Sequence, residues 1–245
     1  MPKDAQIRYA SIDMKVSKHV ESFVLICLVV IFGAAGYQRN HVWRDDFTIW
    51  ADCVAKSPCK ARPHNNLGVA LNERGMVDRA IMEIRNALKL KPDFVNAYVS
   101  LGNAYRDKGM MDMAILKYKT ALSLRPDYAE VHTNIGNIYI KKGLLDQAID
   151  AYRKTLMLKP DSVRALVNIA SSYGQKGLTE KAIAEFKKAL ELEPDNPDIH
   201  YNLGKAYSRK GLYREAAGEY EKALRLNPGD VQARYDLEKI EAWKR

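Results

Sequence analysis

Proline recurs along the chain at a constant interval of 34 residues, with no insertion or deletion between repeats. The column consists of Pro58, Pro92, Pro126, Pro160, Pro194 and Pro228. Three further columns keep this period, one of glycine (Gly75, Gly109, Gly143, Gly177, Gly211), one of alanine (Ala80, Ala114, Ala148, Ala182, Ala216) and one of small residues (Gly68, Gly102, Gly136, Ala170, Gly204). A fixed period of this length is typical of stacked supersecondary structures. The chain is therefore predicted to form a solenoid, in which each repeat buries its apolar face against its neighbours.

The repeat at 129–162 shows why these columns exist. In its first half, VHTNIGNIYIKKG, apolar residues recur three and four positions apart, which predicts an amphipathic helix. A basic residue followed by Gly143 suits the end of that helix, because glycine readily takes a left-handed turn. An acidic residue then opens a second predicted helix, DQAIDAYRKTLML, which the proline closes. We expect Gly136 and Ala148 to let the two helices approach closely, with tyrosines such as Tyr152 filling the space around the contact.

The order of the columns resembles the tetratricopeptide repeat family: a bulky residue, Leu-Gly, Tyr, Gly, Ala, an aromatic residue, Ala and Pro. Five full repeats match, at 61–94, 95–128, 129–162, 163–196 and 197–230. The resemblance implies an all-α fold, a right-handed superhelical solenoid of helix-turn-helix repeats with a concave groove. Three positions depart from the pattern, where Leu71 replaces a tyrosine, Ile84 an aromatic residue and Thr155 an alanine. Segment 231–245 has Glu238 in place of the close-packing glycine, so we expect a C-terminal capping helix there.

An uncharged segment precedes the repeats. Residues 23–36 read FVLICLVVIFGAAG, and their flanks are basic and aromatic, as at the ends of a membrane-spanning helix. We predict a transmembrane helix at 20–37 after an N-terminal cytoplasmic segment at 1–19. This makes the chain a single-pass membrane protein with its solenoid on the extracytoplasmic, periplasmic side. Two alternatives stay open here, a cleaved signal peptide and a buried helix of a soluble protein.

Residues 38–60 are interpreted as an N-capping half-repeat. Counting back from Pro58 by the repeat period places Trp50 at the aromatic position of a second helix and Cys53 at its small-residue position. The junction RNHVWRDDFTIWADCVAKSPCKARPHNNLG also resembles that of polytopic membrane proteins with tetratricopeptide tails, the O-mannosyltransferase-like family. In that family the many preceding membrane helices carry any transferase chemistry. The resemblance therefore implies a tail without transferase activity.

Composition and motifs disfavour several function classes. The net charge of +9 is spread along the sequence with no run of five like charges, which is typical of solvated helix faces and argues against nucleic-acid binding. No phosphate-binding glycine loop, HExxH, CxxC pair or nucleophile elbow occurs, so we expect no enzyme activity, cofactor, metal or small-molecule substrate. His64, His132 and His200 share one column two repeats apart and are interpreted as structural. Cys53 and Cys59 fit free thiols better than a disulfide, and both states stay open.

Asparagine recurs at the sixth position of the first helices. The column reads Asn66, Ser100, Asn134, Asn168 and Asn202, with Asp236 in the terminal helix. Regularly spaced amides can hydrogen-bond an extended peptide backbone through both donor and acceptor, and the ladder resembles that of the tetratricopeptide region of the O-GlcNAc transferase. The alternative, which stays open, is that asparagine is habitual at this position and binds no ligand. The predicted peptide-binding residues are Asn66, Asn103, Asn134, Asn137, Asn168, Asn202, Lys205 and Arg209.

These observations predict a membrane-anchored scaffold that binds a protein or peptide segment in its concave groove and recruits it to a membrane complex. Lys205 and Arg209, one turn apart beside Asn202, favour an acidic residue in that part of the ligand. The alternative is an accessory or remnant subunit of a membrane protein glycosyltransferase, which would present acceptor proteins to a catalytic partner.

Overall fold

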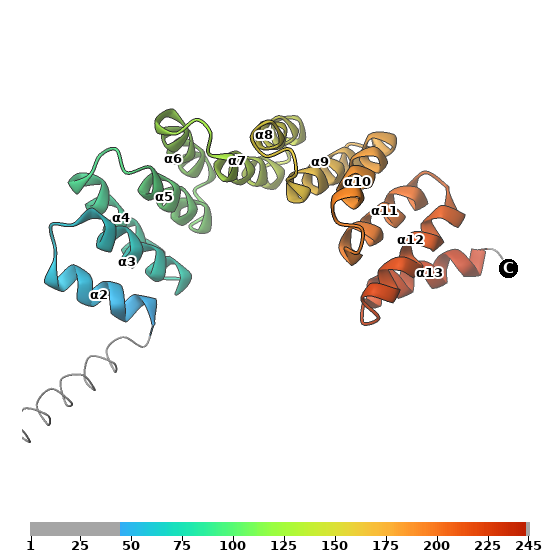
Figure 1. Cartoon of the computed structure of the whole chain (residues 1–245), viewed down its shortest axis with the longest axis horizontal. Helices are drawn as coiled ribbons and strands as arrows, with labels where there is room; N and C mark the ends of the chain where they lie inside the picture. The colour runs from blue at the N-terminus through green and yellow to red at the C-terminus, as the bar shows by residue number, and fades with distance from the viewer. Residues whose placement is uncertain (1–44, 244–245) are drawn as a thin grey trace, which may run out of the picture. The chain divides into compact units, whose positions relative to one another are not determined.

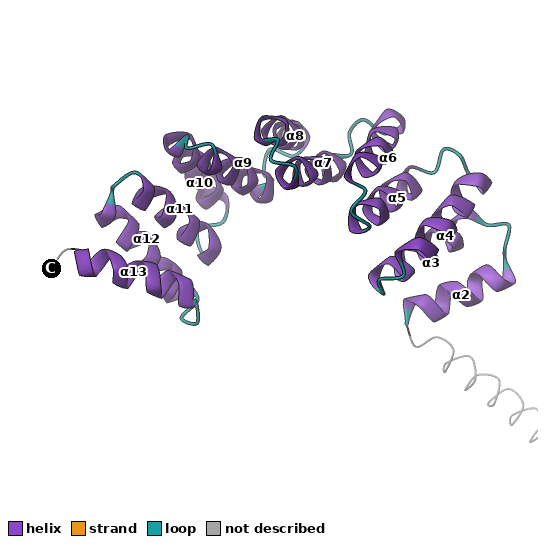
Figure 2. Cartoon of the chain, turned by 180° about the vertical axis from the view of Figure 1, so that it is seen from behind, coloured by secondary structure: helices purple, strands orange, loops and turns teal. Residues whose placement is uncertain are grey.

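The chain is entirely helical in the part that the structure describes. A computed structural model describes residues 45–243. These residues fall into two compact units, which are divided between Lys91 and Pro92. Within residues 45–243 every regular element is an α-helix, twelve in all, with no strand (Figure 2). The predicted all-α class is confirmed.

The helices follow one another in pairs. The first compact unit contains α2 (Asp46–Lys56), α3 (Ala61–Glu73) and α4 (Val77–Leu90). The second contains α5 (Val95–Asp107), α6 (Met111–Leu124), α7 (Ala129–Lys141), α8 (Leu145–Leu158), α9 (Val163–Gln175), α10 (Thr179–Leu192), α11 (Pro197–Arg209), α12 (Tyr213–Leu226) and α13 (Val231–Trp243) (Figure 1). In the second compact unit each odd-numbered helix packs against the even-numbered helix after it, which in turn contacts the next odd-numbered helix.

The turn inside each helix pair requires a backbone conformation that glycine takes most easily. Gly143 has a φ of 72°, in the left-handed region that costs other residues roughly 1–2 kcal/mol. Across this turn the Leu144 N–H donates to the Tyr139 carbonyl oxygen at 2.9 Å, the long hydrogen bond of a Schellman motif. A Cβ added at residue 143 would meet no atom within 4 Å, so the requirement is conformational and not one of space. The helix end predicted at Gly143 is confirmed.

A second column of small residues lets paired helices meet at close range. A Cβ on Gly136 would lie 2.5 Å from Cε1 of Tyr152, and one on Gly102 would clash in the same way with the ring of Tyr118. Both tyrosines are buried, and Ala148 lies in the same core cluster as Tyr152. The predictions of a close approach at Gly136 and of tyrosines in the core are confirmed, and Ala148 is fully buried.

Thr155, which replaces the alanine of the repeat pattern, contacts a threonine on the facing helix. The hydroxyls of Thr155 and Thr133 lie 3.0 Å apart, and both side chains are buried. Thr155 also reaches the carbonyl oxygens of Ala129 and Ala151, at 3.3 and 3.4 Å. The two hydroxyls therefore satisfy each other inside the core, where an unpaired one would cost about 1–3 kcal/mol.

Lysine–acid pairs connect successive repeats at the surface of the second compact unit. Three pairs share one arrangement: Lys142–Asp112, Lys176–Asp146 and Lys210–Glu180. In each, the lysine stands just before a turn glycine, and the acid lies in the first turn of the second helix of the preceding repeat. Because the acids are exposed, each pair contributes only about 0–1 kcal/mol. The equivalent position in α12 holds Arg214, which reverses the charge.

In the first compact unit, α2 packs on α3. The Asp45 carboxylate caps α2 by accepting a hydrogen bond from the Thr48 N–H at 2.9 Å. It also lies 2.5 Å from the guanidinium of Arg74, whose central carbon is 4.2 Å from the centroid of the Phe47 ring. Phe47 and Trp50 contact the buried apolar face of α3. The half-repeat at 38–60 stays a prediction, because residues 38–44 lie outside the described range.

The terminal helix α13 is amphipathic. Ala233 and Ile240 are buried against the second compact unit, and Ile240 shares a cluster with Tyr220 of α12. Glu238, at the position of the close-packing glycine, is exposed, as is Val231. A carboxylate is tolerated at Glu238 because this side of α13 faces water.

The membrane localisation predicted from the sequence is contradicted. Among residues 45–243, no helix combines the length and the apolar character that crossing a bilayer requires, since the repeat helices have 13 or 14 residues against about 20 for a span. The extracytoplasmic placement of the solenoid falls with that localisation. The predicted segments at 1–19 and 20–37 lie outside the described residues.

Candidate functional site

The asparagine column lies on the first helices of the repeats. In the second compact unit Asn134, Asn168 and Asn202 occupy equivalent positions of α7, α9 and α11, and all three are half-buried. The amides of Asn134 and Asn168 form no hydrogen bond with any group in residues 45–243, whereas Asn202 Nδ2 donates to the Asp198 carbonyl oxygen at 2.8 Å. In the first compact unit Asn66 Oδ1 accepts a hydrogen bond from the neighbouring asparagine at 3.2 Å. Asn134 and Asn168 are thus the members best able to serve a ligand.

Asn103 and Asn137 already have a structural task. Their Oδ1 atoms accept hydrogen bonds from the hydroxyls of Tyr118 and Tyr152, at 2.6 and 2.7 Å. Only their Nδ2 atoms are left to donate to a ligand. The sequence carries a signal for this pairing, because the residue types fifteen positions apart change together: Asn103 with Tyr118, Asn137 with Tyr152, Ser171 with Phe186 and Val69 with Ile84. In these four repeats a hydroxyl on the second helix comes with an amide on the first, whereas the fifth repeat combines Tyr220 with Lys205.

Lys205 and Arg209 stand between two adjoining hollows of the second compact unit. One hollow, of about 230 Å³, lies among α9, α10 and α11 and also includes Asn202 and Phe186. The Arg209 guanidinium donates to the Gly174 carbonyl oxygen at 3.1 Å, which joins α11 to α9. The structure therefore brings together the three predicted site residues of the fifth repeat.

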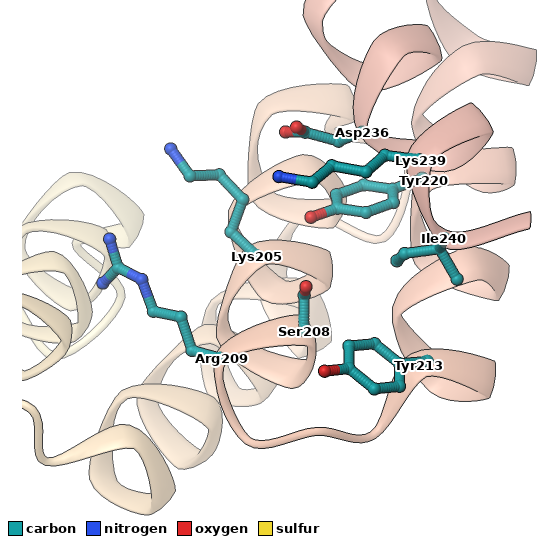
Figure 3. Close-up of a pocket in the computed structure, with 8 residues that line it drawn as sticks. All are labelled: Lys205, Ser208, Arg209, Tyr213, Tyr220, Asp236, Lys239 and Ile240. Atoms are coloured by element: carbon teal, nitrogen blue, oxygen red, sulfur yellow. The ribbon is translucent and has the colours of Figure 1, made fainter. Parts of the chain in front are cut away.

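The other hollow, of about 250 Å³, lies among α11, α12 and α13 (Figure 3). Lys205 and Arg209 line it together with Lys239 and Asp236 of α13 and the hydroxyls of Ser208, Tyr213 and Tyr220. Lys239 was not among the predicted site residues. It follows Lys205 by one repeat period, and this spacing was the signal that could have identified it.

Burial and nearby charges raise the pKa of two tyrosines near this hollow. Burial, with a contribution from the hydrogen bond to Asp236, raises the pKa of Tyr201 to about 12. The pKa of Tyr220 is also raised, first by burial and then by Asp236. Both phenols are therefore neutral near pH 7 and can act as hydrogen-bond donors. Lys205 Nζ lies 5.1 Å from the centroid of the Tyr201 ring, a distance at which cation and ring attract each other.

The histidines hold repeats together. His64 Nδ1 lies 2.6 Å from Glu83 Oε2, and its Nε2 lies 2.9 Å from the Pro58 carbonyl oxygen. His200 makes the equivalent contacts with Glu219 and the Pro194 carbonyl, at 2.6 and 2.8 Å. Each ring bridges the end of one repeat and the second helix of the next, which confirms the structural interpretation at these two positions.

Cys53 is partly buried, Cys59 is exposed, and both are free thiols.

Segments of the chain match known repeat families. Residues 102–143 and 173–211 match the family described as TPR repeat, and residues 129–162 and 197–230 match the family described as Tetratricopeptide repeat. Among curated proteins, a protein O-mannosyl-transferase of Caenorhabditis elegans is 28% identical over 87 residues, which are 35% of this chain and 13% of that protein. The match thus spans a small part of that relative.

Several solved structures share the fold. YrrB, described as a TPR protein with an unusual peptide-binding site, superposes with a TM-score of 0.61 at 21% identity, over 80% of this chain and 98% of YrrB. A structure of MamA superposes with a TM-score of 0.62 at 27% identity, over 68% of this chain and 97% of MamA. Pseudomonas aeruginosa pilF gives 0.62 at 18% identity, over 75% and 87% of the two chains. YrrB and pilF are similar to this chain in fold alone.

Proposed function

We propose that this chain, which contains tetratricopeptide repeats, is a protein-interaction scaffold that binds an extended peptide along the first helices of those repeats. The observation that carries the proposal is the state of Asn134 and Asn168. Both lie half-buried at equivalent positions, and neither amide has a hydrogen-bond partner within residues 45–243. Each amide offers two donors and an acceptor to a peptide bond.

The ladder suits a ligand of varied sequence. Peptide N–H and C=O groups are the same in every residue, so contacts to them hold a backbone without selecting side chains. Lys205 and Arg209 add a preference for acidic character in the part of the ligand near α11. Asn103 and Asn137 contribute donors only, because their oxygens are engaged by tyrosines.

The proposal is tested with peptides selected from a random display library against the full chain. The affinities of the selected peptides are then measured for Asn134→Ala/Asn168→Ala. Each lost hydrogen bond costs about 0.5–1.5 kcal/mol, so the double variant should bind about 5- to 140-fold more weakly. Asn96→Ala is the matched control, because Asn96 is an exposed asparagine of the same compact unit outside the ladder.

Two results would contradict the proposal. One is that selection yields no peptide that binds the chain. The other is that the double variant binds the selected peptides as well as the Asn96→Ala control does. The second result would favour the interpretation in which these asparagines are habitual and bind no ligand.

A second candidate function is the presentation of acceptor proteins to a glycosyltransferase. The similarity of 87 residues to part of a protein O-mannosyl-transferase supports it. Cross-linking of the full chain in its own cells should then recover a glycosyltransferase together with its acceptor proteins. Recovery of a partner set that contains no transferase would count against this candidate and leave the peptide-binding proposal standing.

A further inference from the structure

We propose that the hollow among α11, α12 and α13 binds a phosphorylated serine or threonine of the peptide ligand, an inference that rests on the proposed peptide-binding function. Three cationic residues line the hollow, Lys205, Arg209 and Lys239, with the Arg209 guanidinium turned toward the Gly174 carbonyl of α9 (Figure 3). None of the three forms an ion pair with a carboxylate in residues 45–243. Other lysines of this compact unit are paired, such as Lys210 with Glu180. Unpaired cations around one hollow create a site for an anion.

The repeat pattern explains why the hollow occurs at this end of the chain. Lys205 occupies the position that Asn103 and Asn137 occupy in earlier repeats. Those asparagines accept hydrogen bonds from the hydroxyls of tyrosines on the second helix. With lysine there, the Tyr220 hydroxyl has no such acceptor. It lies in the hollow beside Ser208, as Figure 3 shows. In this repeat the tyrosine hydroxyl therefore faces Ser208 at the wall of the hollow and not an asparagine.

Charge decides between a phosphate and a single carboxylate. Three cations and the Asp236 carboxylate leave a formal charge of about +2 around the hollow. The Asp236 carboxylate accepts a hydrogen bond from the Tyr201 hydroxyl at 3.1 Å. A phosphorylated side chain carries about −1.5 to −2 at pH 7 with three strong acceptor oxygens. One carboxylate would neutralise only half of this charge.

Two acidic residues of an extended ligand would not replace one phosphate. Successive side chains of an extended chain point to opposite faces, so one hollow receives one side chain. The volume of about 250 Å³ is several times the roughly 30 Å³ that a water molecule occupies in the liquid, which is ample for a phosphorylated side chain. Hydroxyl donors from α11 and α12 complement the cations of α11 and α13.

The test compares three degenerate peptide libraries that are identical except for a central phosphoserine, glutamate or serine. Binding to the full chain is measured by fluorescence anisotropy, and Lys239→Ala is compared with Lys119→Ala. Lys119 is an exposed lysine on α6, so the control removes the same charge away from the hollow. We expect the phosphoserine library to bind at least tenfold tighter than the glutamate library. Lys239→Ala should abolish most of that advantage, and Lys119→Ala should leave it intact.

Each outcome separates this inference from the proposed function. Equal binding of the phosphoserine and glutamate libraries would overturn the phosphate site and leave peptide binding in place. A phosphoserine preference that survives Lys239→Ala and also Lys205→Ala would place the phosphate elsewhere and overturn the assignment to this hollow. Failure of all three libraries, and of every selected peptide, would instead reject the peptide-binding function itself.

Discussion

The Tyr152 hydroxyl donates a hydrogen bond to Asn137 Oδ1 at 2.7 Å, across the interface between α8 and α7. Tyr152→Phe should destabilise the fold by about 0.5–1.5 kcal/mol, because Asn137 loses its donor. The fourth repeat solves the same contact with Phe186 and Ser171. Tyr152→Phe/Asn137→Ser should therefore cost less than the sum of the single changes. The free energies of unfolding of the two single variants and the double variant are measured by urea denaturation, followed by circular dichroism. Strictly additive changes in these free energies would show that the two side chains are not coupled.

Gly136→Ala should be destabilising by about 1–3 kcal/mol. The added Cβ would lie 2.5 Å from the Tyr152 ring, which the surrounding core holds in place. Gly218→Ala on α12 is the matched control, because its Cβ would meet no atom within 4 Å. There the change should stabilise the helix by roughly 0.5–1 kcal/mol. Thermal unfolding distinguishes the two variants, and a shift of the same sign in both would contradict the packing argument.

Removal of the buried face of α13 should expose the end of the array. Ile240 is 5% exposed and lies against Ala216, Ala217 and Tyr220. Ile240→Ala should cost about 2–5 kcal/mol and make the protein less soluble. Val231→Ala, at a position that is 78% exposed, should change stability by less than about 0.5 kcal/mol. Unfolding midpoints and the concentration at which aggregation begins provide the measurement, and equal behaviour of both variants would rule out a covering role.

His132 should make the third repeat sensitive to acid. Burial and then Lys154 lower its pKa below the ordinary value of 6.5, against the opposing hydrogen bond of the Pro126 carbonyl. The unfolded chain therefore binds the proton more readily than the folded one. The contribution of His132 to stability should be complete above pH 6.5 and be lost as the pH falls below that value. The dependence of the urea midpoint on pH, compared with that of His132→Leu, isolates this contribution.

Ala151→Glu should reverse that behaviour. Ala151 stands where Glu83 and Glu219 contact the other two histidines of the column at 2.6 Å. A carboxylate at this position would favour the protonated ring, so the pKa of His132 should rise. An NMR titration of the imidazole protons tests the change. A pKa of His132 that stays the same or falls would show that the third repeat does not reproduce the contact.

Much of the fold followed from the sequence because each repeat column reports one local requirement. Gly143 could be placed at a left-handed turn, and Gly136 beside a tyrosine, since a side chain missing at a fixed period indicates either a turn or a close contact. The Thr133–Thr155 contact was not predicted, because periodicity shows which column is broken and not what compensates for it. The membrane localisation was wrong. It had been inferred from the uncharged segment at 20–37 and from a resemblance, whereas no helix of residues 45–243 is long and apolar enough to cross a bilayer.

The candidate site was less accessible from the sequence. The ladder was visible as a column, yet its members differ in hydrogen bonding: Asn202 is engaged by its own helix, and Asn134 is not. Such differences depend on side-chain rotamers, which no sequence pattern specifies. Lys239 belongs to the site because α13 lines the same hollow as α11, and that shared lining is a property of the packed helices.

The lysine–acid pairs between repeats all run the same way along the chain, from a lysine to an acid of the preceding repeat. Each lysine reaches back to the acid of the repeat before it, so an extra copy of 129–162 inserted after residue 162 would meet a complementary neighbour on both sides. A repeat appended behind the fifth one would instead bring its lysine to Arg214. Like charges there would repel at low salt. An additional repeat should therefore be accommodated more readily between existing repeats than after the fifth one.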